Sequence, residues 1–120
     1  MRESQWTQKL KKALEAALPG SVVLKHNDAI TGGIPDLSIT SFEAGPYART
    51  TWIEVKLIGA PSVMFKPLQC EMLKRLGGWY CVWGPNVRRG WLFRADEREG
   101  WHTGQQYTFA ELVERICRFF

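Results

Sequence analysis

Residues 50–57, with the sequence TTWIEVKL, are the stretch that decides the fold. Apolar side chains occupy every second position from Ile53 to Leu57, and Glu54 and Lys56 lie between them. This alternation is typical of a β-strand that turns one face to a hydrophobic core. An acid and an amine two residues apart on the other face lie roughly 6.5–7 Å from each other. Such a pair could simply face solvent, or it could belong to a site.

The segments on both sides of this strand predict an α/β domain with a mixed sheet. Pro19-Gly20 and Gly77-Gly78 end two helices, and Thr108 can cap a third. Two strands joined through a helix should be parallel, and strands joined by short turns antiparallel. Loops are expected over 27–35, 42–49 and 58–66, and an irregular segment over 96–106. The predicted elements are a helix over 3–18, strands over 21–26, 36–41 and 50–57, a helix over 67–76, strands over 79–83 and 91–95, and a helix over 109–119.

Length and composition limit the class of protein. A chain of 120 residues is expected to form one domain, 1–120, and its 45% apolar and 23% charged residues are ordinary for a soluble protein. Sixteen Lys and Arg against 12 Asp and Glu give a net charge of +4, which suits a polyanionic partner. The three cysteines form no C-x-x-C pair, so a reducing compartment fits best. No signal peptide or membrane span is expected.

Asp36 opens the strand predicted before the TTWIEVKL strand, and its side chain can lie on the same face as Glu54. Two carboxylates from adjacent strands can converge on one cation. Oxygen ligands of this kind suit Mg²⁺ or Mn²⁺. The sequence therefore predicts a divalent metal site on this face, with the backbone carbonyl of Val55 as a further ligand.

Glu3 and Gln69 are polar residues at apolar phases of their helices. Glu3 projects into the stripe that contains Trp6 and Leu10, whereas Glu15 projects away from it. Glu3 could alternatively be a first-turn acid favoured by the helix dipole. Gln69 lies in a second stripe, which we expect to comprise Leu68, Met72, Leu73 and Leu76, with Glu71, Lys74 and Arg75 on the outer side. Gln69 should therefore turn to the polar face of the sheet, unless it lies at the edge of the stripe and reaches solvent.

The strings Gly33-Ile34-Pro35-Asp36, Glu54-Val55-Lys56 and Pro67-Leu68-Gln69 resemble the PD-(D/E)XK nuclease superfamily. More narrowly, they resemble its VRR-NUC family, including small stand-alone phage members. That family's pattern is a helix with a Glu, then G-x-PD, then E-x-K on the next strand, then a Gln in the following helix. The resemblance spans Glu3 to about Gly84, and Glu54-Val55-Lys56 is the only (D/E)-x-K in the chain.

The resemblance implies a restriction-endonuclease-like αβββαβ core, with a strand and a helix added at the C-terminus. It also implies a metal-dependent DNA endonuclease, in which Asp36, Glu54 and Glu3 hold Mg²⁺ or Mn²⁺ while Lys56 and Gln69 assist the attacking water. Branched DNA is the implied substrate, a homodimer the implied assembly, and the cytoplasm of a bacterial or phage-infected cell the implied location. Sequence-specific or single-strand nucleases on the same fold, and a non-catalytic binding module, are the alternatives.

Four further residues could contact nucleic acid. Arg88 and Arg89 lie in a turn bounded by Pro and Gly, Lys66 precedes the second helix, and His26 precedes the loop that leads to Asp36. Cations of this kind bind phosphates. Arg88 and Arg89 could equally form a solvated hairpin tip, and His26 an exposed strand end.

Overall fold

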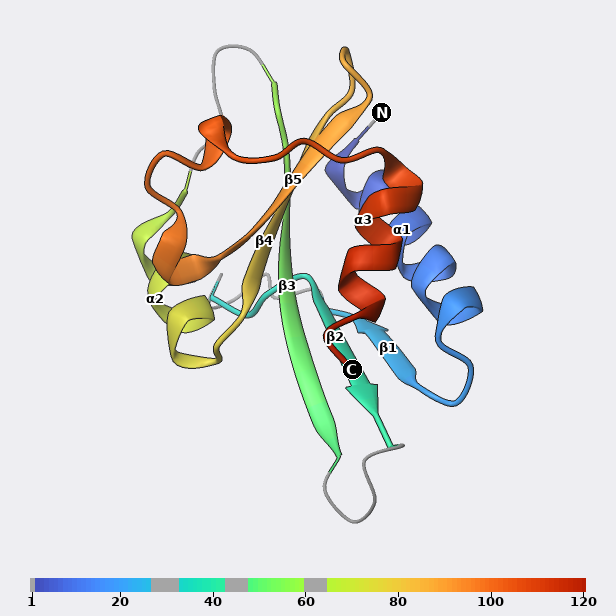
Figure 1. Cartoon of the computed structure of the whole chain (residues 1–120). Coiled ribbons are helices and arrows are strands. Elements are labelled where there is room, and N and C mark those ends of the chain that lie inside the picture. The colour runs from blue at the N-terminus through green and yellow to red at the C-terminus, as the bar shows by residue number, and fades with distance from the viewer. Residues whose placement is uncertain (1, 27–32, 43–47, 60–64) are drawn as a thin grey trace.

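In the computed structural model, a mixed five-stranded sheet lies between two layers of helices (Figure 1). The structure describes residues 2–26, 33–42, 48–59 and 65–120. The order of helices and strands is the predicted one, and most boundaries lie within two residues of prediction. Parts of the three predicted loops, 27–32, 43–47 and 60–64, lie outside the described residues. The elements are α1 (Glu3–Ala17), β1 (Val22–Lys25), β2 (Leu37–Ser41), β3 (Arg49–Leu57), α2 (Pro67–Arg75), β4 (Trp79–Gly84), β5 (Arg89–Arg94), the short 3-10 helices η1 (Ala95–Glu97) and η2 (Trp101–Thr103), and α3 (Phe109–Cys117).

The strands follow one another across the sheet in chain order, from β1 to β5. β3 and β4 are parallel and are connected through α2, whereas β1–β2, β2–β3 and β4–β5 are antiparallel. These pairings confirm the predicted mixed sheet. The TTWIEVKL stretch forms β3 and is therefore the middle strand, with neighbours on both sides.

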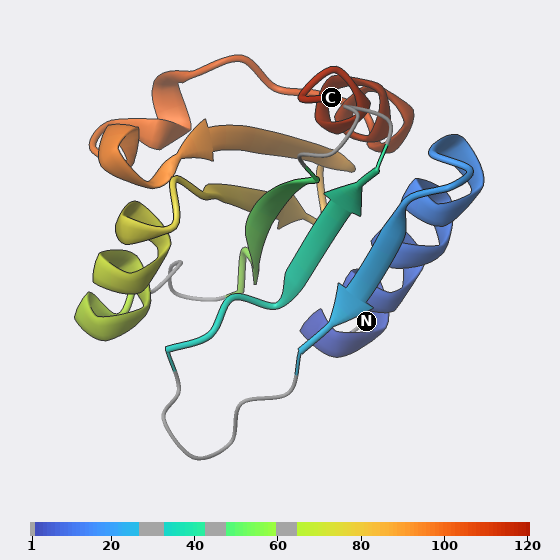
Figure 2. The ribbon, with the colours of Figure 1, turned by 90° about the horizontal axis from the view of Figure 1, so that it is seen from below.

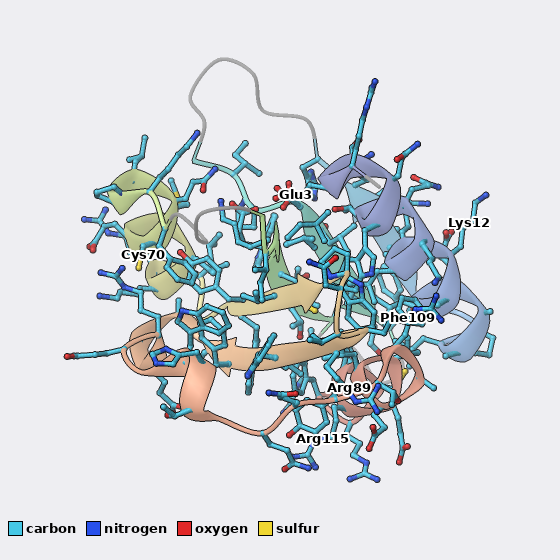
Figure 3. The ribbon with its side chains drawn as sticks, turned by 90° about the horizontal axis from the view of Figure 1, so that it is seen from above. Glu3, Lys12, Cys70, Arg89, Phe109 and Arg115 are labelled. Carbon is cyan, nitrogen blue, oxygen red and sulfur yellow. The ribbon has the colours of Figure 1, made fainter. Side chains whose placement is uncertain are left out.

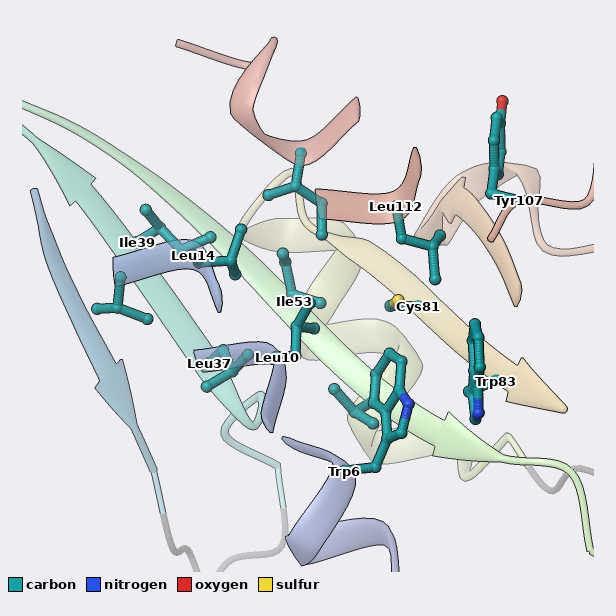
Figure 4. Close-up of a cluster of buried hydrophobic side chains, with 13 residues drawn as sticks. Trp6, Leu10, Leu14, Leu37, Ile39, Ile53, Cys81, Trp83, Tyr107 and Leu112 are labelled. Atoms are coloured by element: carbon teal, nitrogen blue, oxygen red, sulfur yellow. The ribbon is translucent and has the colours of Figure 1, made fainter. Parts of the chain in front are cut away.

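One face of the sheet packs against α1 and α3 and forms the larger core (Figures 2 and 4). Trp6 of α1 is completely buried and stacks on Trp83 of β4, with 5.4 Å between ring centroids. Each large side chain removed from water in this way stabilises the fold by roughly 1.5–3 kcal/mol. The other buried members of this core are Leu10, Leu14, Val23, Leu37, Ile39, Ile53, Val55, Cys81, Tyr107, Leu112 and Ile116.

The opposite face packs against α2 and the two 3-10 helices. Cys70 and Leu73 of α2 lie in this second core, together with Tyr80, Val82, Trp91, Phe93 and Ala95. The side chain of Trp101 covers it from η2, stacking on Phe93 with 5.8 Å between centroids. The residues predicted to be irregular over 96–106 therefore include two short helical turns that close this core.

The predicted apolar stripe of α2 is confirmed for Leu73 and wrong for Leu68, Met72 and Leu76. Only Cys70 and Leu73 are buried, whereas Leu68 is 57% exposed and Met72 and Leu76 are also exposed. The helix is nine residues long and buries only a narrow line of residues at i, i+3 spacing, so the other apolar side chains stay exposed. Glu71, Lys74 and Arg75 are exposed as predicted.

No helix in the described part of the chain has the length and apolar character needed to cross a membrane. The α/β class and the mixed sheet flanked by helices are as expected from the sequence. The specific restriction-endonuclease-like arrangement stays a prediction.

Candidate active site

Asp36 and Glu54 lie side by side on adjacent strands. Asp36 immediately precedes β2, and the antiparallel register pairs Leu37 with Ile53. The backbone N–H of Asp36 donates to Glu54 Oε1 at 3.1 Å, and the backbone N–H of Val55 donates to Asp36 Oδ2 at 2.9 Å. These reciprocal bonds hold two carboxyl groups that are 18 residues apart in sequence at one point of the sheet.

The Glu54 carboxyl is in an unfavourable place for a charge. Glu54 is only 3% exposed. Burial, followed by hydrogen bonding to Asp36 and repulsion from its charge, raises the pKa of Glu54 to about 9. Lys56 and the Asp36 backbone N–H act in the opposite direction but do not outweigh these effects. A positive charge placed between the two carboxyl groups would remove the repulsion.

The Lys56 ammonium is positioned by two side chains. Its Nζ donates to Gln69 Oε1 at 2.9 Å and lies 3.9 Å from Glu54 Oε2. Gln69 therefore turns from α2 toward the polar face of β3, as its helical phase predicted, and its amide oxygen has a partner. The predicted amine and amide thus lie together beside the carboxyl pair.

Glu3 reaches the end of β3 from the first turn of α1 (Figure 3). Its Oε2 accepts a hydrogen bond from the backbone N–H of Leu57 at 3.2 Å. Glu3 is nevertheless exposed, because it lies before the first buried residue of the helix, Trp6. Glu15 is exposed as predicted and pairs with Lys11 on the outer surface at 2.9 Å.

The described residues fit a partial shell for a hard divalent cation. They contain no group of three or more His, Cys, Asp or Glu side chains placed to hold a metal ion. Asp36 and Glu54 do supply two oxygen donors in contact, and the Val55 carbonyl lies on the same strand. Mg²⁺ is commonly held by one or two carboxylates while it keeps several waters. The carboxyl pair fits that requirement, and Glu3, bonded to Leu57, is not part of a three-acid cluster here.

The predicted nucleic-acid contacts are dispersed. Arg88 is exposed in the turn between β4 and β5, with a left-handed backbone at φ 53°. Arg89 is also exposed, but it is the first residue of β5 rather than part of the turn. Lys66 is the exposed N-cap residue of α2. His26 adjoins the carboxyl pair, because its backbone N–H donates to the Asp36 carbonyl at 2.8 Å.

Ser38 also belongs to this face, but its contact with His26 was not predicted from the sequence. It is only 4% exposed, and its Oγ lies 2.7 Å from His26 Nε2. Strand alternation places Ser38 on the side of Asp36, because it lies two residues later, but alternation does not identify its partner. The His26 side chain is thus partly buried and held, rather than a free strand end.

Neither a scan against models of protein families nor a search of curated proteins gives a match to this chain. The resemblance to VRR-NUC nucleases stays a prediction that depends on the motifs quoted above.

Proposed function

We propose that this protein is a divalent-metal-dependent DNA endonuclease that hydrolyses phosphodiester bonds. The observation that supports this most is that backbone hydrogen bonds hold the Asp36 and Glu54 carboxyl groups side by side, with the Lys56 ammonium 3.9 Å from Glu54 Oε2. A buried acid beside a second acid costs stability unless a cation or a proton lies between them. Such an arrangement is readily explained if it serves to bind a cation and an anionic substrate.

Each residue has a separate task in this proposal. A divalent cation, when bound, supplies charge that lowers the pKa of a water nucleophile and offsets charge on the phosphate. Asp36 and Glu54 hold that cation, and the Lys56 ammonium orients the water and stabilises negative charge developing on the phosphate. The Gln69 amide fixes the Lys56 side chain, so Gln69 is a positioning residue.

Branched DNA of the Holliday-junction type is the substrate that we propose. The net charge of +4 suits a polyanion, and the sequence motifs resemble a family associated with such DNA. The alternatives are a sequence-specific or single-strand nuclease on the same fold, and a nucleic-acid-binding module without catalysis. A homodimer is part of the same proposal and follows from the resemblance alone.

A cleavage assay with matched acid variants tests the proposal. Labelled junction, flap, single-stranded and duplex DNAs are incubated with Mg²⁺ or Mn²⁺. Asp36→Asn, Glu54→Gln and Lys56→Ala should each lose at least about 100-fold in rate. Asp96→Asn is the control, because Asp96 is an exposed acid paired with Arg94 at 3.5 Å and should leave the rate unchanged. Metal-independent cleavage, or full activity in Glu54→Gln, would overturn the site. Binding of DNA without cleavage by any metal would favour the binding module.

Glu3 and Glu15 form a second matched pair, since both are exposed acids of α1. Glu3→Gln should lower the cleavage rate, because the Glu3 carboxylate lies at the end of the strand that carries the site. Glu15→Gln should not. Equal rates for the two variants would show that Glu3 takes no part in the reaction.

A further inference from the structure

His26, Ser38 and Trp52 form a row beside the proposed catalytic pair. The sheet register aligns Leu24, Ser38 and Trp52 across β1, β2 and β3. Trp52 and Glu54 are two residues apart on β3, so they share a face and lie roughly 6.5–7 Å from each other. The rings of His26 and Trp52 are 5.3 Å apart between centroids, with 34° between their planes.

This row has a defined geometry. The Ser38 hydroxyl fixes the His26 ring through a 2.7 Å contact, and the backbone of His26 is bonded to that of Asp36. His26 and Trp52 are both partly exposed. Leu24 of β1, which the register places beside Ser38, is 50% exposed. On the other side of the sheet face, α2 covers the part beyond β3. Trp52 packs in part against the core under α2, and the rings of both His26 and Trp52 keep a partly exposed surface.

We propose that the His26–Trp52 pair is a stacking platform for an unpaired nucleotide next to the scissile phosphate. This inference rests on the proposed nuclease function and specifies its substrate. Aromatic rings bind bases through their π faces without regard to sequence. In a duplex both faces of every base are stacked on neighbours, so only an unpaired base is available to the platform. A separation of roughly 6.5–7 Å corresponds to about two nucleotides at 3.4 Å per nucleotide of a stacked strand.

Among branched DNAs, the platform thus selects those with an unpaired base within about two nucleotides of the cleaved bond, as at a flap or at a junction with an unpaired base. Stacking of one base on an aromatic side chain corresponds to roughly tenfold tighter binding. Fully paired duplex should lack this gain. In this proposal, the His26 and Trp52 rings determine the preference for unpaired DNA, whereas the carboxyl groups take part in the cleavage reaction.

A fluorescent base tests the platform directly. A DNA junction with one unpaired 2-aminopurine at the branch is titrated with protein in Ca²⁺, beside a duplex in which the same base is paired. The wild-type protein should quench the unpaired probe and bind the junction about tenfold more tightly than the duplex. Trp52→Leu and His26→Ala should lose both effects, and Trp52→Phe, which keeps an aromatic ring, should retain most of them. His102→Ala is the control, because His102 is exposed on η2.

Circular dichroism of each variant verifies that it is folded. Equal binding of junction and duplex by the wild-type protein would overturn the inference, as would undiminished quenching in both Trp52→Leu and His26→Ala. Cleavage of the same DNAs in Mg²⁺ separates the two proposals. Cleavage without quenching refutes the platform and leaves the nuclease, whereas quenching without cleavage supports the platform and refutes the nuclease.

Discussion

At the scale of single residues, Glu54 is where stability and the proposed function conflict. A glutamine of the same shape would avoid the repulsion from Asp36, and the buried carboxyl is the less stable choice at neutral pH. Burial raises the pKa of Glu54 from its ordinary 4.5 to about 9. Between these values the folded protein keeps a proton that the unfolded chain has released. The proton's contribution to stability is therefore complete below the lower value and is lost as pH rises through the upper one.

Glu54→Gln should flatten this pH dependence in metal-free protein. In a chelating buffer, the melting temperature of the wild type should fall relative to that of Glu54→Gln as pH rises from 5 to 9. Glu15→Gln should follow the wild type, because Glu15 is an exposed residue that pairs on the surface. Thermal scans at several pH values measure the difference. Parallel curves for wild type and Glu54→Gln would show that Glu54 ionises normally in the fold.

Single residues were also where the sequence was most informative about the site. The alternation in β3 predicted correctly that Glu54 and Lys56 leave the core face, and the helical phase predicted that Gln69 meets them. The contact of Ser38 with His26 was missed, because strand alternation gives the face of a serine but not its partner. The partners of such residues depend on the register of the paired strands. The sequence restricts the possible registers but does not determine one.

At the scale of elements, local signals located the ends of the helices. Thr108 caps α3, and its hydroxyl accepts a hydrogen bond from the backbone N–H of Glu111 at 3.2 Å. The Glu111 carboxylate accepts one in return from the backbone N–H of Thr108 at 2.9 Å. This reciprocal pair can be read from the sequence, because its spacing is fixed by helix geometry alone. The packing of α2 could not be predicted from the sequence, because a short helix can bury several different lines of residues.

Thr108→Ala should therefore destabilise the protein by about 1 kcal/mol, the usual cost of a lost N-cap. Thr108→Ser keeps the hydroxyl and should lose much less. Urea unfolding of the two variants and the wild type measures this. Equal midpoints for the alanine and serine variants would mean that the cap contributes nothing.

The connection from α2 to β4 depends on a glycine at position 78. A Cβ there would lie 2.4 Å from Leu73 Cδ1 and 2.9 Å from the Trp52 backbone oxygen. Gly78→Ala should thus cost about 1–3 kcal/mol by forcing α2 and β3 apart. Gly59→Ala is the matched control, because its Cβ would meet no atom within 4 Å. Denaturant unfolding compares them, and an unchanged midpoint for Gly78→Ala would show that the contact is not tight.

At the scale of the whole molecule, the layered sheet brings distant parts of the chain to one face. Asp36, Glu54, Lys56 and Gln69 come from the start of β2, from β3 and from α2, and Glu3 of α1 reaches the end of β3. The order of elements and the parallel β3–β4 pair followed from the sequence, since a helix between two strands favours a right-handed crossover. The position of Trp101 over the second core could not be predicted from the sequence, because the residues around Trp101 carry no periodic pattern.

The central claim is that Asp36 and Glu54 share one divalent cation. Crystals grown with Mn²⁺ test it most directly, through anomalous scattering at the manganese edge. We predict a single strong peak within bonding distance of both carboxyl groups, and its loss in Glu54→Gln. A map without a peak at this pair, in protein that still cleaves DNA with Mn²⁺, would contradict the account.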